Sequence, residues 1–130
     1  MVPTELVEQE WPRAEPFIAR ACARDETQDP ISVFGEILTG SQALWVGWDE
    51  DGVKTYGTTK IYDTALKRIC VINLAAGDNV SDHFEYCCNV FANYAKDMEC
   101  EILEIQGRAG WKVLEPIGFK KVAVLYRKDL

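Results

Sequence analysis

Apolar residues along the chain alternate between helical and extended spacing. In three segments they recur at steps of three and four, the pattern of amphipathic helices. We expect these helices at residues 6–23, 30–39 and 79–99. Pro12 and Pro16 lie inside the first segment, and each removes a backbone hydrogen bond. We therefore expect a turn near Glu10 and Trp11, with the main helical segment beginning at one of the two prolines.

The other apolar segments are rich in β-branched and aromatic residues, which predicts strands. They lie at residues 43–48, 53–62, 67–74, 101–105 and 119–126. Asp51-Gly52 between the first two indicates a hairpin turn. The third segment is more continuously apolar, as in a central strand that is covered on both faces. A short helix that opens at residues 107–111 separates the last two strands.

The order of these elements predicts an α/β fold, also classified as α+β, in which helices flank a mixed sheet. A chain of 130 residues corresponds to one domain, here residues 1–130, and is long enough to bury a hydrophobic core. The strand at 67–74 and the strand at 101–105 are joined through the long helix. We expect a right-handed connection, with these two strands as parallel neighbours.

The net negative charge of the chain argues against some classes of binding partner. Lys and Arg number 14 against 21 Asp and Glu, a net charge of −7. This balance argues against direct nucleic-acid binding, which depends on Lys and Arg, and against an anionic membrane surface. No apolar run approaches the roughly 18 residues that a membrane span needs. The acidic first residues contain no signal peptide, so we expect a protein that is not secreted.

Cysteine and histidine offer few candidates for chemistry. The five cysteines have no regular spacing and form no C-x-x-C motif, so we expect buried free thiols. His83 and Cys87 are four residues apart on one helix, which could make two metal ligands or a thiol beside its base. A structural zinc site needs four ligands, and nothing else is spaced to complete one. We therefore expect no metal, with His83 at the surface.

The C-terminal motifs resemble a known family. The strand–helix–strand order and the sequence Gly107-Arg108-Ala109-Gly110-Trp111, followed by Gly118-Phe119, resemble the C-terminal half of GNAT-type N-acetyltransferases. The sequence motifs also resemble those of small GNAT-like proteins of tailed bacteriophages. That second resemblance rests on Trp11-Pro12, Leu44-Trp45-Val46, Gly107 to Trp111, Leu114 and Gly118-Phe119. The resemblance implies a GNAT-like mixed sheet over most of the chain.

The resemblance also implies where acetyl-CoA would bind. In GNAT enzymes the strand before the long helix splays from its neighbour, and a loop of the form (Arg/Gln)-x-x-Gly-x-(Gly/Ala) holds the pyrophosphate. Residues 75–82 here contain one glycine, no Arg or Gln, and two aspartates. Each carboxylate would repel a pyrophosphate by roughly 1–2 kcal/mol, whereas the helix dipole offers about 0.3–1 kcal/mol. We expect no cofactor; if acetyl-CoA does bind, the expected contacts are Leu74, Ala76, Gly77 and Asn79.

Catalytic and interface residues are harder to assign. GNAT enzymes commonly use a tyrosine on the last helix as the acid, and residues 111–117 contain none. Tyr94 and Tyr126 are the nearest substitutes, but neither matches the family position, so the catalytic residues stay unknown. Trp48, Arg108 and Trp111 are candidates for a protein interface. Arg108 and Trp111 also suit structural roles, in a tight turn and in the core respectively.

Two functions remain open at this point. The first is a non-catalytic interaction or structural protein of a tailed bacteriophage, such as an internal or adaptor protein of the virion. Its expected partners are other phage chains or a second copy of itself, and its expected location is the host cytoplasm or the virion. The alternative is an active acetyl-CoA-dependent N-acyltransferase that acts on a small amine or a protein lysine.

Overall fold

A computed structural model describes residues 1–77, 80–106 and 112–130. Their elements are η1 (Thr4–Leu6), α1 (Val7–Cys22), α2 (Pro30–Leu38), β1 (Ala43–Asp49), β2 (Gly52–Asp63), β3 (Arg68–Gly77), α3 (Val80–Asp97), β4 (Ile102–Ile105) and η2 (Lys112–Ile117). The strands form one sheet in the order β1-β2-β3-β4. β1, β2 and β3 are antiparallel, and β4 runs parallel to β3. The predicted hairpin, mixed sheet and parallel pair are confirmed.

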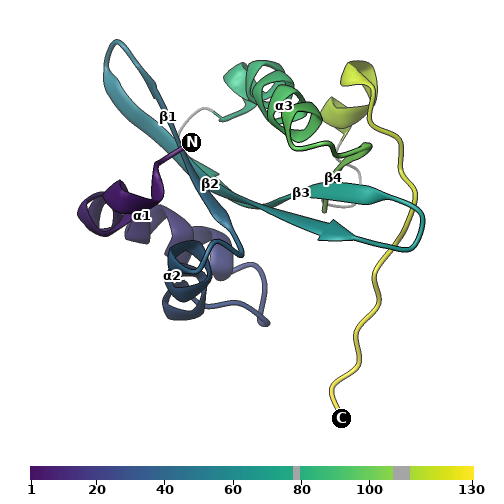
Figure 1. The fold of residues 1–130 in the computed structure, drawn as a ribbon, viewed down its shortest axis with the longest axis horizontal. Helices are drawn as coiled ribbons and strands as arrows, with labels where there is room; N and C mark the ends of the chain where they lie inside the picture. Colours follow the sequence, from purple (N-terminus) through teal and green to yellow (C-terminus); the bar gives the residue numbers. More distant parts are fainter. Residues whose placement is uncertain (78–79, 107–111) are drawn as a thin grey trace.

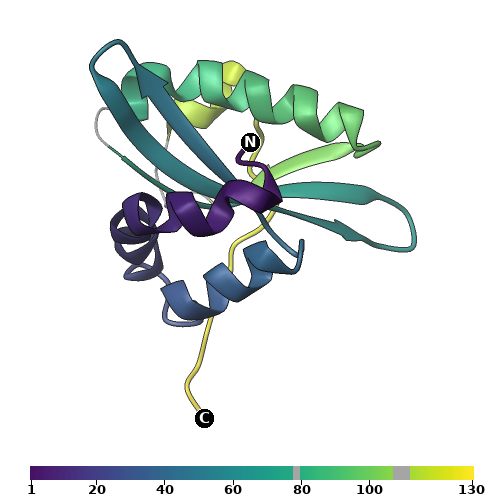
Figure 2. The ribbon, with the colours of Figure 1, turned by 60° about the vertical axis from the view of Figure 1, so that its left-hand side comes forward.

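Helices cover both faces of the sheet. α1 and α2 lie on one face, and α3 lies on the other (Figures 1 and 2). Asp29 caps α2: its carboxylate accepts hydrogen bonds from the backbone N–H and the hydroxyl of Ser32, at 3.0 and 2.8 Å. Pro30 then occupies the first turn of α2, where a missing N–H does no harm. The helix ends before Gly40, which has a positive φ of 86°.

The predicted break in the first helix is wrong. α1 is continuous from Val7 to Cys22 and contains both Pro12 and Pro16. The two prolines lie on the exposed side of the helix, where water can satisfy the carbonyls that lose their partners. On the opposite side, Ala14 and Ile18 are fully buried. Burial of that side offsets the roughly 3 kcal/mol that an interior proline costs.

The sheet separates two hydrophobic clusters. The first lies under α1 and α2 and is the larger; its buried members are Val2, Val7, Ala14, Ile18, Ala21, Cys22, Val33, Ile37, Leu44, Tyr56, Leu74 and Ala76. The second lies under α3, where Ile72, Phe84 and Cys88 are buried. Trp45 of β1 also faces α3 and meets Phe91 with ring centroids 5.0 Å apart. Side chains of β1 therefore alternate between the two faces of the sheet: Leu44 packs under α1 and α2, and Trp45 packs under α3.

A β-bulge in β3 divides that strand between the two clusters. Thr58 of β2 is opposite Leu74, but the next residue, Thr59, is opposite Ile72, so Asn73 has no partner across the ladder. The extra residue reverses the alternation of side chains. Ile72 consequently packs in the cluster under α3, while Leu74 packs in the cluster under α1.

The predicted strand at residues 119–126 is wrong. After η2, residues 119–130 contain neither helix nor strand. Phe119 packs against the second cluster, and the chain beyond it runs without regular structure toward the loop between α1 and α2, where Arg127 lies 3.3 Å from Asp25 (Figure 1). Val122, Val124 and Tyr126 are 75%, 59% and 89% exposed. The β-forming residues are present, but in the described structure they have no partner strand, and a strand is stable only when it is paired.

Two further expectations concern helices near the end of the chain and membranes. The short helix continues as the 3-10 helix η2, whereas its predicted opening at residues 107–111 lies outside the described residues. Within the described part of the chain, no helix combines the length and apolar character needed to cross a membrane.

Candidate acyl-carrier site

The candidate site is the gap that opens where β3 and β4 part. β4 pairs with β3 only over Ile69–Ile72 of β3, and β3 continues to Gly77. Over the described residues, the β4 side of β3 from Asn73 to Gly77 therefore has no strand partner. Gaps of this kind, outside the carboxyl ends of parallel strands, are frequent ligand sites in α/β proteins.

Two of the residues expected to contact acetyl-CoA, Leu74 and Ala76, have carbonyl groups that face β2 and not the gap. The side chains of Leu74 and Ala76 are 5% and 7% exposed and belong to the cluster under α1. Asn79 lies outside the described residues, as does Asp78. Leu74, Ala76 and Gly77 lie near the end of β3, where each is paired with β2. Contact with a cofactor stays a prediction for all four expected residues.

Gly77 has a packing reason to be glycine. A Cβ atom there would lie 2.4 Å from the carbonyl oxygen of Lys54 and 2.6 Å from Cβ of Thr55. A hydrogen bond also holds β2 and β3 together here: the hydroxyl of Thr55 donates to the carbonyl of Ala76 at 2.8 Å. Close approach of β2 therefore explains this glycine without any ligand.

Side-chain hydrogen bonds fix the bulge at the beginning of the gap. The Asn73 amide donates to the side-chain oxygens of Gln28 and Gln42, at 2.8 and 3.0 Å. Gln28 donates in turn to a carboxylate oxygen of Asp25 at 2.9 Å. The pKa of Asp25 is held well below its usual range, first by the Gln28 hydrogen bond and then by Thr27, with Arg127 contributing. Residues from two loops are thus tied to the extra residue of β3.

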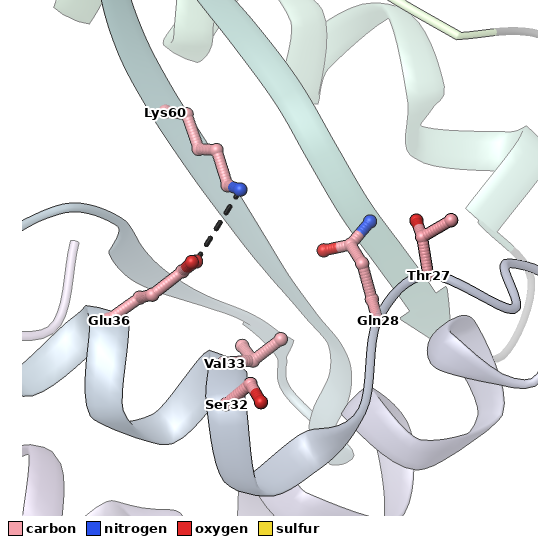
Figure 3. Close-up of a pocket in the computed structure, with 6 residues that line it drawn as sticks. All are labelled: Thr27, Gln28, Ser32, Val33, Glu36 and Lys60. Carbon is pink, nitrogen blue, oxygen red and sulfur yellow. Dashed lines mark ion pairs between the residues drawn. The ribbon is translucent and has the colours of Figure 1, made fainter.

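The network continues into a hollow of about 230 Å³ between the α1–α2 loop, α2 and β2 (Figure 3). Gln42 donates to a carboxylate oxygen of Glu36, and Lys60 Nζ lies 3.4 Å from the same atom. The Gln42 hydrogen bond, then Lys60, lowers the pKa of Glu36. Glu36 and Lys60 thus pair with one another at the wall of the hollow, and both side chains are partly exposed.

The tyrosines considered as catalytic acids lie away from the gap. Tyr94 packs edge-on against Trp45 of β1, with centroids 5.0 Å apart and an interplanar angle of 81°. Burial raises its pKa. Tyr126 lies in the exposed C-terminal segment. The catalytic residues therefore stay unknown.

Sequence analysis missed a buried tyrosine. Tyr56 is 1% exposed and its hydroxyl donates to the carboxylate of Glu10 in α1. Burial, followed by that hydrogen bond, raises the pKa of Tyr56 to about 12. No local pattern could have revealed this pair, because its members are 46 positions apart in the chain. The pair joins α1 to β2 and has a structural role.

The interface candidates are only partly placed. Trp48 is 70% exposed near the β1–β2 turn, and it is paired across the hairpin with Val53, which is 41% exposed. Arg108 and Trp111 lie outside the described residues. Use of Trp48 as a contact stays a prediction.

Thiol and metal chemistry gain no support from the geometry. All five cysteines are free, and burial raises the pKa of Cys70 and of Cys88 to about 11, so both thiols stay protonated at neutral pH. His83 is exposed beside the half-buried Cys87. Among the residues that the structure describes, no three His, Cys, Asp or Glu side chains are grouped as metal ligands would be.

Comparisons with known proteins identify the architecture. No protein-family model matches the sequence, and no curated protein matches it either. Solved structures do match. An aminoglycoside acetyltransferase from an uncultured soil metagenomic sample, in complex with sisomicin, has a TM-score of 0.72 at 8% identity, over 99% of this chain and 93% of that one.

Two other acetyltransferases give the same result. The ribosomal-protein-alanine N-acetyltransferase of Brucella melitensis biovar Abortus 2308 has a TM-score of 0.67 at 11% identity, covering 99% of this chain and 96% of its own. Glucosamine-6-phosphate N-acetyltransferase of Arabidopsis thaliana has a TM-score of 0.65 at 12% identity, covering 98% and 94%. At these identities the likeness concerns architecture alone. The chain has the GNAT fold.

Proposed function

We propose that this chain is an interaction protein that uses the GNAT fold without catalysis, as a virion or assembly component of a tailed bacteriophage. Its partners are proteins, and its place is the host cytoplasm or the virion. The phage assignment is supported by the sequence resemblance in Trp11-Pro12, in Leu44-Trp45-Val46 and in the C-terminal motif. The comparisons bear only on the fold.

The observation that carries the proposal is the exposed apolar surface of the C-terminal segment. Val122, Val124, Leu125 and Tyr126 are each more than half exposed and follow one another within five positions. Proteins that act alone rarely leave such a contiguous group in water, whereas protein interfaces are built from such groups. Trp48 adds a second exposed aromatic side chain.

The absence of catalysis is supported by the contents of the gap. Gly77 is explained by the approach of Lys54 and Thr55, so it is no evidence for a phosphate-binding loop. Tyr94 packs against β1. Tyr94 is therefore not placed to protonate a thiolate leaving group at the end of β3.

The alternative is an acetyl-CoA-dependent N-acyltransferase that acts on a small amine or a protein lysine. Two features favour it: the parting of β3 and β4 beyond Ile72, and the bulge at Asn73, which directly follows the last residue of β3 that pairs with β4. In this alternative, Leu74, Ala76 and Gly77 would contact the acyl carrier, with Asn79 beside the pyrophosphate.

A thermal-shift titration with acetyl-CoA separates the two functions. A ligand at 100 times its Kd stabilises the native state by about 2.7 kcal/mol, which for a domain of this size raises Tm by roughly 8 °C or more. We expect no shift at 1 mM acetyl-CoA beyond that given by 1 mM sodium pyrophosphate, the control for unspecific anion binding. A shift of several degrees specific to acetyl-CoA would support the acyltransferase and contradict the proposal.

A further inference from the structure

A second hollow lies between the sheet and the C-terminal half of α3. Its volume is about 320 Å³, at the lower end of the range for small-molecule sites. Ala43 and Ile61 of the sheet and Tyr94 and Met98 at the end of α3 line it with apolar surface. Ala43, Ile61 and Tyr94 are half-buried and Met98 is 40% exposed, so part of this surface stays uncovered. We call this space the α3 hollow.

Two opposite charges also line the α3 hollow. They belong to Asp63 and Arg68, which flank the turn between β2 and β3. Nη1 of Arg68 donates to a carboxylate oxygen of Asp63 at 3.3 Å, and Nε donates to the carbonyl of Met98 at 3.0 Å. The end of α3 therefore holds the guanidinium in place. Among the described residues, Nη2 of Arg68 and the second carboxylate oxygen of Asp63 make no hydrogen bond, so both can receive a ligand.

An ion pair that is open on one side favours a ligand with both charges. A simple anion would approach Arg68 but would be repelled by the Asp63 carboxylate beside it, and a simple cation would be repelled by the guanidinium. An ammonium and a carboxylate close together in one ligand would each meet the opposite charge, through hydrogen bonds between charged groups. The negative end of the α3 dipole favours the ammonium further.

An α-amino acid has this arrangement of charges. Its ammonium and carboxylate are attached to one carbon atom, and an apolar side chain on that carbon could cover the uncovered surface of Ala43, Ile61 and Met98. We propose that the α3 hollow binds a free amino acid with an apolar side chain. Arg68 holds the carboxylate of the amino acid, and Asp63 holds its ammonium.

The inference goes beyond the proposed function and does not depend on it. Arg68 is the first residue of β3, whereas the gap between β3 and β4 begins at Asn73. These two positions are about 16 Å apart along an extended strand. The α3 hollow is therefore separate from the place where an acyl carrier would bind, and an amino acid in it would not be an acyl acceptor.

The test is a titration of the full chain with L-leucine, followed by the amide chemical shifts in NMR spectra. We expect saturable shifts at residues 59–63, at Arg68 and at residues 94–98. Two matched analogues separate the charges: 4-methylpentanoate lacks the ammonium, and 3-methylbutylamine lacks the carboxylate. Each should bind at least about tenfold more weakly than leucine, because each meets an uncompensated like charge. Glycine, which has no side chain, should also bind more weakly.

Substitutions assign the roles. Arg68→Gln and Asp63→Asn should each weaken leucine binding about tenfold or more; the second leaves the hydrogen bond between Arg68 and α3 intact. The matched controls are Lys67→Gln and Glu101→Gln, since this neighbouring ion pair of 3.1 Å does not line the hollow. Both controls should leave the Kd within about twofold. Ala43→Leu fills the hollow with both charges in place and should abolish binding, and a well-dispersed spectrum verifies that each variant is folded.

Four results would overturn the inference. The first is the absence of saturable shifts with leucine. The second is binding of 4-methylpentanoate or 3-methylbutylamine as tightly as leucine, which would show that one of the two charges has no role. The third is a set of shifts centred on residues 73–77, which would place the ligand in the gap. The fourth is leucine binding that Asp63→Asn and Ala43→Leu leave unchanged.

Discussion

Replacing Gly77 by alanine tests whether this glycine serves packing or a ligand. The added Cβ would lie 2.4 Å from the Lys54 carbonyl oxygen and 2.8 Å from the Thr55 Cα, both backbone atoms. Backbone atoms in a paired strand cannot rotate away as a side chain can, so β2 and β3 must move apart locally. Overpacking of this kind costs about 1–3 kcal/mol.

For a domain of this size that loss lowers Tm by about 4–15 °C. Thermal denaturation followed by circular dichroism measures it, with no ligand present. Gly35→Ala is the matched control, because Gly35 lies within α2 and a Cβ there meets nothing within 4 Å. Alanine in a helix interior should stabilise by roughly 0.5–1 kcal/mol.

The outcome decides between two explanations of Gly77. If Gly77→Ala melts within 1–2 °C of the wild type, the strand accommodates the methyl group and the packing argument fails. The glycine would then need another reason, such as close approach of a ligand, and the acyltransferase alternative would gain support.

Three further substitutions test the polar interior. Asn73→Ala should lower stability by about 1–3 kcal/mol in urea denaturation, because the side-chain oxygens of Gln28 and Gln42 lose the donor that Asn73 supplies. Asn89→Ala on the exposed side of α3 should change little. Thr58→Val should stabilise by about 1–2 kcal/mol, since the Thr58 hydroxyl is the one described buried side-chain polar atom without a hydrogen-bond partner; a loss of stability would show that the hydroxyl is satisfied. The folded-state pKa of Asp25 is depressed, so its contribution is fully present above the unfolded pKa of about 3.9 and is lost as pH falls through the folded value. The stability difference between the wild type and Asp25→Asn should therefore shrink between pH 5 and pH 2, and a constant difference would contradict that reasoning.

Local pattern predicted most of the elements, and the errors have identifiable physical causes. The helical repeat that buries Ala14 and Ile18 outweighs the breaks suggested by Pro12 and Pro16, because the prolines lie on the solvent side. The β-forming sequence at 122–126 predicted a strand, but sequence specifies propensity and not the presence of a partner edge. Pattern alone cannot supply that second strand.

The candidate site was predictable in place but not in detail. The order of strands located the gap after Leu74, and the parallel pairing of β3 and β4 agrees with it. The bulge at Asn73 was not visible, because it arises from pairing between β2 and β3 and from partners in distant loops. Nor could the sequence show that Gly77 abuts Lys54, since that contact depends on the sheet register.

The division of the interior by the sheet has a consequence for how the molecule opens. The two hydrophobic clusters share no residue, so α3 can detach and take its own cluster with it while α1 and α2 remain packed. Amides of α3 should then exchange through a partial opening of lower free energy than those of α1, which require the whole chain to unfold. Such a molecule would consist of two cooperative units built on one sheet, and the unit that contains α3 would be the weaker of the two.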